Sequence, residues 1–207
     1  MKVLNKIGWG FFVFFAIVVG LYPYGYLLSN VLAENGLLAN KPDSIKENII
    51  WAFQFKVHIY LGGIALLTGW SQFIKRWRDT RLNFHRSLGK IYLIMVMLSG
   101  VSGLYIAYYA DGGIISQLGF TGLALSWLYT TTMAYLTIRR KEINNHQKWM
   151  IRSYALTFAA VTLRIWLPLF QYGFGMDFVT AYVIIAWLCW VPNIIWAQWK
   201  VKRLGLA

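Results

Sequence analysis

The chain has 207 residues, of which 58% are hydrophobic and only 13% are charged, and its formal net charge is +13. Soluble domains carry about 25% charged residues, and a soluble protein of this length could not cover so much apolar surface, so the composition excludes a water-soluble class. The single cysteine, Cys189, excludes an internal disulfide framework and a thiolate metal cluster.

Six long apolar segments follow one another along the chain. A bilayer core requires about 20 apolar residues per helix. The runs are continuous rather than alternating, which favours spanning helices over spanning strands. We therefore expect an all-α integral membrane bundle of six transmembrane helices that forms one domain over residues 1–207. The predicted spans are about residues 8–29, 48–74, 88–110, 114–138, 149–171 and 178–199.

The first apolar segment has two interpretations. Lys2 and Lys6 precede it, and Val31-Leu32-Ala33 resembles a signal-peptide cleavage site. Its apolar stretch is too long for a signal peptide, and Tyr22-Pro23-Tyr24 interrupts it. We therefore expect a retained anchor helix, and cleavage would leave the other five spans oriented as before.

The basic residues are distributed unevenly between the segment ends. Sixteen of the 20 Lys and Arg residues lie at alternate ends, whereas five of the 7 acidic residues lie at the opposite ends. This positive-inside pattern predicts that both termini are cytoplasmic. It also argues against nucleic acid as a partner and favours contact with the lipid bilayer, including anionic headgroups at the cytoplasmic face.

Three predicted spans carry a stripe of small or polar residues at helical spacing. At 100° per residue, the stripe of the second span falls within an arc of about 80°. Close packing between membrane helices accounts for the glycines, but it does not account for His58 and Arg164. The stripes are Gln54, His58, Gly62, Ala65, Gly69, Gln72 and Arg76 in the second span; His85, Gly89, Tyr92, Val96, Gly100, Gly103 and Ala107 in the third; and His146, Met150, Ser153, Thr157, Ala160 and Arg164 in the fifth.

His58 and Arg164 are predicted to share one layer of the membrane. At 1.5 Å per residue, they lie roughly 5 and 6 Å outward of the midplane. A charge at that depth is costly, so it should face the bundle and find a partner. The nearest acids are Asp111 and Asp177 at the outer surface. The alternatives are an anionic ligand or cofactor carboxylate, and an arginine that snorkels outward or satisfies broken backbone near Pro168.

A second polar cluster is predicted at the inner surface. One interpretation is that its members are interfacial anchors and positive-inside charges. The other is a pocket for an anionic headgroup, a quinone or a haem, with histidines as ligands or proton carriers. The cluster comprises His85, Arg86, Lys90, Arg140, His146 and Arg152. Asn83-Phe84-His85 and Asn144-Asn145-His146 both open a span, which a duplicated helical hairpin or chance could explain.

These polar residues carry a family resemblance over about residues 50–170. The chain resembles an uncharacterised bacterial membrane-protein family, domain of unknown function 2306. Lys90 stands where the family pattern favours Arg. The resemblance implies a multi-pass fold in the inner membrane of a bacterium and supplies no chemistry. The residues that carry it are His58, Gly62, Gly69, Gln72-Phe73, His85-Arg86, Gly89-Lys90, Tyr92, His146, Trp149-Met150, Arg152-Ser153 and Arg164.

The leading functional hypothesis is a redox protein of the b-type cytochrome kind that holds haem b. It rests on three histidines, small-residue helix faces, abundant aromatic residues and an arginine suited to a haem carboxylate. His58 has no partner histidine in the outer half, so a single haem would use His85 and His146. The predicted cofactor-binding residues are His58, His85, His146, Arg164, Arg86, Arg152 and Gln72.

Two other functions compete with the redox hypothesis. One is a proton-coupled transporter or binding protein for a small anion or lipid, with Arg164 as counter-charge and His58 as the titrating group. The other is an assembly partner of a larger membrane complex, in which the 11 tryptophans pack against partner helices. We place no catalytic residues, because the sequence shows no HExxH motif and no carboxylate pair for acid–base chemistry. We also expect no separate metal site, since two histidines lie inside and one lies outside.

Overall fold

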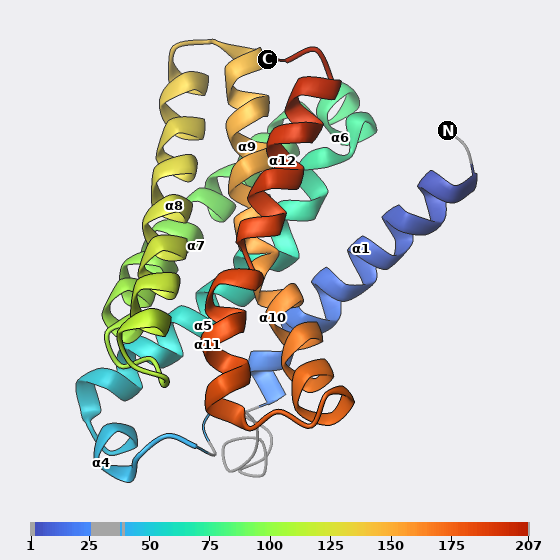
Figure 1. The fold of residues 1–207 in the computed structure, drawn as a ribbon. Coiled ribbons are helices and arrows are strands. Elements are labelled where there is room, and N and C mark those ends of the chain that lie inside the picture. The colour runs from blue at the N-terminus through green and yellow to red at the C-terminus, as the bar shows by residue number, and fades with distance from the viewer. Residues whose placement is uncertain (1–2, 26–37, 39, 207) are drawn as a thin grey trace.

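The computed structural model describes residues 3–25, 38 and 40–206, and all regular secondary structure within these residues is helical. The long helices form a bundle, and the N-terminal end of α1 leans away from it (Figure 1). The all-α expectation is therefore confirmed. The elements are α1 (Val3–Leu21), η1 (Tyr22–Tyr24), α4 (Asp43–Lys46), α5 (Ile49–Gly69), η3 (Trp70–Phe73), α6 (Lys75–Thr80), α7 (Leu82–Ala107), α8 (Ile114–Arg139), α9 (Ile143–Thr157), α10 (Ala159–Pro168), η4 (Leu169–Gly173), α11 (Phe178–Leu188) and α12 (Val191–Arg203).

Five helical stretches of the described chain are long and apolar enough to cross a bilayer. They are Lys6–Tyr24, Ile49–Phe73, Leu82–Ala107, Ile143–Gly173 and Phe178–Arg203. The remaining predicted span, 114–138, coincides with α8, a helix of 26 residues. Helix α8 is less apolar because hydroxyl and amide side chains interrupt it, among them Gln117, Ser126 and Thr130.

Some predicted span boundaries differ from the helix boundaries. Helix α7 begins at Leu82 instead of 88, and α9 begins at Ile143 instead of 149. Hydropathy detects only the part of a helix that lies in hydrocarbon, whereas these helices include a polar turn or more at their inner ends. Residues 26–29, which close the first predicted span, lie outside the described residues.

Four helices form a ring at the centre of the bundle. Helix α5 contacts α7 and α9, and α8 also contacts α7 and α9, so α7 and α9 lie diagonally opposite each other. Their buried interior includes Leu66, Tyr92 and Tyr154. Helix α1 packs on α5 and α10, while α11 and α12 cover α8 and α9. At the α1–α5 crossing, a Cβ on Gly63 would lie 2.6 Å from the carbonyl oxygen of Gly20, so the two backbones touch there.

Two of the spans are broken, although both were predicted as continuous helices. Helix α9 ends at Thr157 and α10 resumes at Ala159, while α11 ends at Leu188 and α12 resumes at Val191. Pro192 lies in the first turn of α12, where its ring removes one intrahelical N–H and clashes with the carbonyl four residues earlier. The break at Phe158 has no comparable cause in the sequence, because no Gly or Pro stands among the neighbouring residues 155–160.

Side chains satisfy the backbone at the two breaks and connect them. The hydroxyl of Thr162 on α10 donates to the carbonyl of Cys189 at 2.5 Å. The amide of Asn193 on α12 donates to the carbonyl of Ala155 at 3.2 Å and to that of Cys189 at 3.0 Å. Backbone groups in hydrocarbon need such partners, so Thr162 and Asn193 stabilise two interruptions that lie against each other.

Candidate functional site

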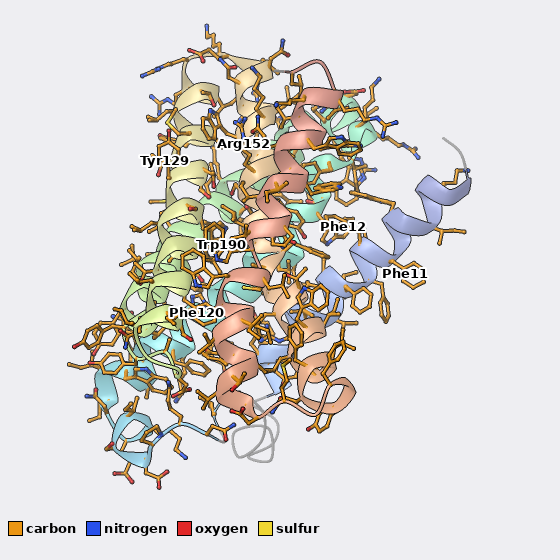
Figure 2. The ribbon with its side chains drawn as sticks, in the orientation of Figure 1. Phe11, Phe12, Phe120, Tyr129, Arg152 and Trp190 are labelled. Atoms are coloured by element: carbon orange, nitrogen blue, oxygen red, sulfur yellow. The ribbon has the colours of Figure 1, made fainter. Side chains whose placement is uncertain are left out.

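A cavity of about 210 Å³ lies among α1, α5, α7, α8, α9, α10 and α11. His58 and Arg164 both line it, together with mainly apolar side chains such as Phe120, which projects from α8 (Figure 2). Cys189, at the break between α11 and α12, also lines it, and Figure 2 shows the neighbouring Trp190 at that break. The structure thus brings together the two residues that the membrane-depth argument placed in one layer.

The imidazole of His58 is held against α7. Its Nδ1 lies 2.9 Å from the carbonyl oxygen of Ser99, and the Ser99 hydroxyl donates to the carbonyl of His58 at 2.8 Å. A carbonyl only accepts, so Nδ1 carries the proton and, in the neutral ring, Nε2 is an acceptor. A Cβ on Gly103 would lie 3.0 Å from Nδ1, so the glycine leaves the space that the ring occupies.

The guanidinium of Arg164 lies between α10 and η1. Its Nη1 donates to the carbonyl of Ala160 at 3.0 Å, and its Cζ lies 4.9 Å from the centroid of the Tyr22 ring. The side chain therefore combines a backbone hydrogen bond with a cation–π contact. Arginine has five N–H donors and can serve several acceptors at once. This arrangement places a positive charge on an otherwise apolar cavity.

An ion pair closes the outer end of the cavity. Lys41 Nζ lies 3.0 Å from Asp111 Oδ1, with only 7% and 19% of the two side chains exposed. Lys41 also donates to the carbonyl of Tyr109. Asp111 therefore pairs with Lys41, and Asp177, the other acid considered for Arg164, caps α11 through Thr180. The sequence placed Lys41 and Asp111 at the outer surface but gave no sign that the loops carrying them meet.

A buried hydroxyl cluster closes the deep end. Trp127 Nε1 donates to Thr157 Oγ1 at 2.9 Å, and Thr157 Oγ1 lies 2.8 Å from the Tyr92 hydroxyl. Tyr92 lies 2.6 Å from Ser153 Oγ, which in turn lies 2.7 Å from Thr131 Oγ1. Trp127 and Thr157 line the cavity. These side chains join α7, α8 and α9 and separate the cavity from the inner half of the bundle.

The remaining predicted site residues lie in the inner half, and none of them lines the cavity. His146 Nδ1 lies 2.8 Å from the carbonyl oxygen of Ala134. His85 Nδ1 is buried and, within the described part of the chain, has no hydrogen-bond partner. The two imidazoles are close enough to interact electrostatically.

The other members of the inner group have separate surroundings. Arg152 donates from Nη2 to Gln198 Oε1 at 2.7 Å and lies over the ring of Trp149; Figure 2 shows it on α9 in the half opposite Phe120. Gln72 is buried beside Ser71, to which its Nε2 donates at 3.3 Å. Arg86 is exposed. The predicted cofactor set therefore divides into an outer pair and an inner group.

Sequence reasoning missed several residues that shape the cavity. Pro192 stands inside an apolar run and could have signalled the broken helix. Trp127 and Thr131 belong to a span whose hydroxyl residues look like ordinary helix packing. Neither the described geometry nor the comparisons support a haem or redox site, because the outer cavity holds one histidine and does not extend to the other two.

Comparison with known proteins yields a family but no activity. The model of the family described as "Predicted membrane protein (DUF2306)" matches residues 55–201 and so includes His58, His85, His146 and Arg164. No curated protein matches the chain, and no solved structure matches it. The protein is a predicted multi-pass membrane protein of unknown function. On the extent of the family match, the chain belongs to the DUF2306 family of predicted membrane proteins.

Proposed function

We propose that this protein binds a small anion in the outer half of the membrane and carries it across the bilayer together with a proton. The observation that carries the proposal is the cavity that Arg164 and His58 line together. A guanidinium at this depth is costly unless it serves a ligand or a structural partner. The surrounding apolar residues exclude water, which strengthens the attraction between the guanidinium and an anion.

The two broken helices favour binding and transport over a purely structural role. Residues from both breaks, among them Thr157, Ala159 and Cys189, line the cavity. Irregular backbone at membrane depth is tolerated where it is buried in protein or lines a cavity. Many transporters bind substrate between discontinuous helices near the bilayer midplane. The breaks at 158 and 189–190 lie near the centres of the spans 143–173 and 178–203.

The proposed topology is six spans in a bacterial inner membrane, with both termini cytoplasmic. Helix α8 would be the sixth span, since it lies alongside α7 and α9 and measures roughly 39 Å at 1.5 Å per residue. Both ends of the chain lie toward the same end of the bundle (Figure 1), which an even number of spans requires. The basic segment ends then meet anionic headgroups on the cytoplasmic side.

The chemistry divides between the two cavity residues. Arg164 supplies the positive charge for the anion. His58 offers Nε2 as an acceptor while Ser99 holds Nδ1, so protonation would occur at the nitrogen that does not bond to Ser99. A histidine can gain and lose a proton near neutral pH. Anion entry with a proton would therefore leave the cavity with an unchanged net charge.

The experiment that tests the proposal compares Arg164→Gln with the matched control Arg139→Gln, because Arg139 is an exposed arginine on α8. Purified protein in proteoliposomes would be assayed for uptake of acetate, butyrate and phosphate under an imposed pH gradient. We expect uptake of at least one anion by the wild type and by Arg139→Gln. Arg164→Gln should lose at least tenfold of that uptake.

Arg164→Lys keeps the positive charge and is the control for a variant that fails to fold. If Arg164→Gln elutes and melts like the wild type yet transports equally well, Arg164 has no role in anion binding and the proposal is wrong. Absence of uptake and of thermal stabilisation by every anion in the wild type would also overturn it. The redox hypothesis has its own test. A Soret band in protein expressed with added haem would favour haem binding over proton-coupled anion transport.

A further inference from the structure

Polar and apolar groups are separated along the cavity. Its charged lining residues, Lys41, Asp111 and Arg164, and its histidine, His58, come from the outer half. The deeper lining is small or apolar, with Gly62, Gly63, Leu66, Leu123 and Leu156. The one hydroxyl there, on Thr157, is already bonded to Trp127 and Tyr92. A ligand that fills the cavity would therefore be polar at one end and apolar at the other.

The cavity is elongated along α5. Its lining on this helix extends from Trp51 to Leu66, which corresponds to roughly 22 Å along the helix axis. The part of this lining from His58 inward to Leu66 measures roughly 12 Å, about the length of an extended chain of six to eight carbon atoms. A single apolar chain of that length would match the apolar part of the cavity.

We propose that the ligand is a monocarboxylate with one apolar tail of roughly six to eight carbon atoms, the length of the cavity from His58 inward to Leu66. The carboxylate lies in the outer part with Arg164 and His58, and the tail extends inward toward Leu66 and Leu156. This inference rests on the proposed function and adds the class of the ligand. It follows from the division of the cavity into a charged part and an apolar part.

The test is a chain-length series. Acetate, butyrate, hexanoate, octanoate and dodecanoate would be titrated calorimetrically into protein in nanodiscs of zwitterionic lipid, with empty nanodiscs as the blank and 1-octanol as the uncharged analogue. Each methylene buried in the cavity should raise the affinity up to about fourfold. We expect the affinity to rise as far as octanoate and then to stop rising, and we expect 1-octanol to bind at least tenfold more weakly than octanoate.

A cavity-filling variant locates the tail. Ala160 lines the cavity one turn inward of Arg164 on α10, so Ala160→Leu should reduce the ratio of octanoate affinity to acetate affinity. Ala52→Leu is the control, because Ala52 is half-buried on α5 and does not line the cavity. Equal affinity for acetate and octanoate, both lost in Arg164→Gln, would overturn the chain-length inference and leave anion binding intact. Equal binding of octanoate and 1-octanol, or no binding of any carboxylate, would overturn both.

Discussion

The hydroxyl of Tyr92 lies 2.6 Å from that of Ser153, and each of these residues stands seven positions after a histidine, His85 on α7 and His146 on α9. Because seven residues are about two helical turns, the bond places the diagonal helices in matched register. Each histidine also stands four positions after the N-cap residue of its helix, which is Arg81 for α7 and Glu142 for α9. This correspondence favours the duplicated hairpin over chance as the origin of the short sequence echo.

Tyr92→Phe should destabilise the bundle. The substitution removes the hydroxyl that bonds to both Ser153 and Thr157, and a buried polar group that loses its partner costs about 1–3 kcal/mol. The melting temperature in a fixed detergent should fall, whereas Tyr172→Phe, at a side chain that is 87% exposed, should leave it unchanged. If Tyr92→Phe melts like the wild type, the hydroxyl cluster contributes nothing to stability.

Gly63→Ala should weaken the crossing of α1 and α5. Alanine normally favours a helix over glycine by about 1 kcal/mol, but here the new Cβ would lie 2.6 Å from the Gly20 carbonyl oxygen and must displace backbone. Gly10→Ala is the matched control on α1, because nothing lies within 4 Å of its added Cβ. Thermal melts should show a loss for Gly63→Ala alone; a gain at both positions would contradict the close approach.

The ion pair between Lys41 and Asp111 should respond to a charge swap. Lys41→Asp leaves two carboxylates facing each other, at a cost between the roughly 0.2–1 kcal/mol of exposed pairs and the roughly 3–5 kcal/mol of buried pairs. Limited proteolysis of residues 40–48 should be faster in this variant. The double variant Lys41→Asp with Asp111→Lys should restore the wild-type rate. Faster cleavage in the double variant than in Lys41→Asp would show that the two side chains do not pair.

Asp177 should make the stability of α11 depend on pH. Hydrogen bonds from the side chain and the backbone N–H of Thr180 hold the pKa of this carboxyl below its ordinary value. A carboxyl whose pKa is lower in the folded state stabilises the fold above its unfolded pKa of about 3.9, and this contribution is lost as the pH falls through the folded value. Asp177→Asn caps the helix without titrating. Melting temperatures should therefore differ between the two proteins near neutral pH and converge in acid; a difference independent of pH would refute the assignment.

Hydropathy predicted most of the fold, because the bilayer dictates helix length, while the orientation inferred from the basic ends stays a prediction. The segment 114–138 is less apolar than the other predicted spans, because it carries residues such as Thr130 and Thr131, whose hydroxyls bond to carbonyls within α8. The predicted third span begins later than α7, because the first turn of α7 precedes the apolar run that hydropathy detects.

Only those residues of the candidate site that stand at a polar position deep within a predicted span could be predicted from the sequence. His58 and Arg164 are polar residues in hydrocarbon, so their spacing from the span ends was enough to place them in one layer. The pair Lys41–Asp111 depends on two loops that meet, and the break at Phe158 depends on Asn193, 35 positions away in sequence. Contacts of this kind arise from tertiary packing and leave no periodic pattern in the chain.

The lean of α1 bears on how a ligand reaches the cavity. The inner half of α1 exposes Phe11 and Phe14, whereas Ala16 and Val19 are buried where the helix meets the bundle. Val19 of α1 and Pro23 of η1 contribute to the cavity wall, and the backbone contact with α5 at Gly20 lies between them in sequence. Rotation of α1 about that contact would open the wall sideways, toward the acyl chains of the outer leaflet. A molecule already dissolved in the lipid could then enter without first passing through the water outside.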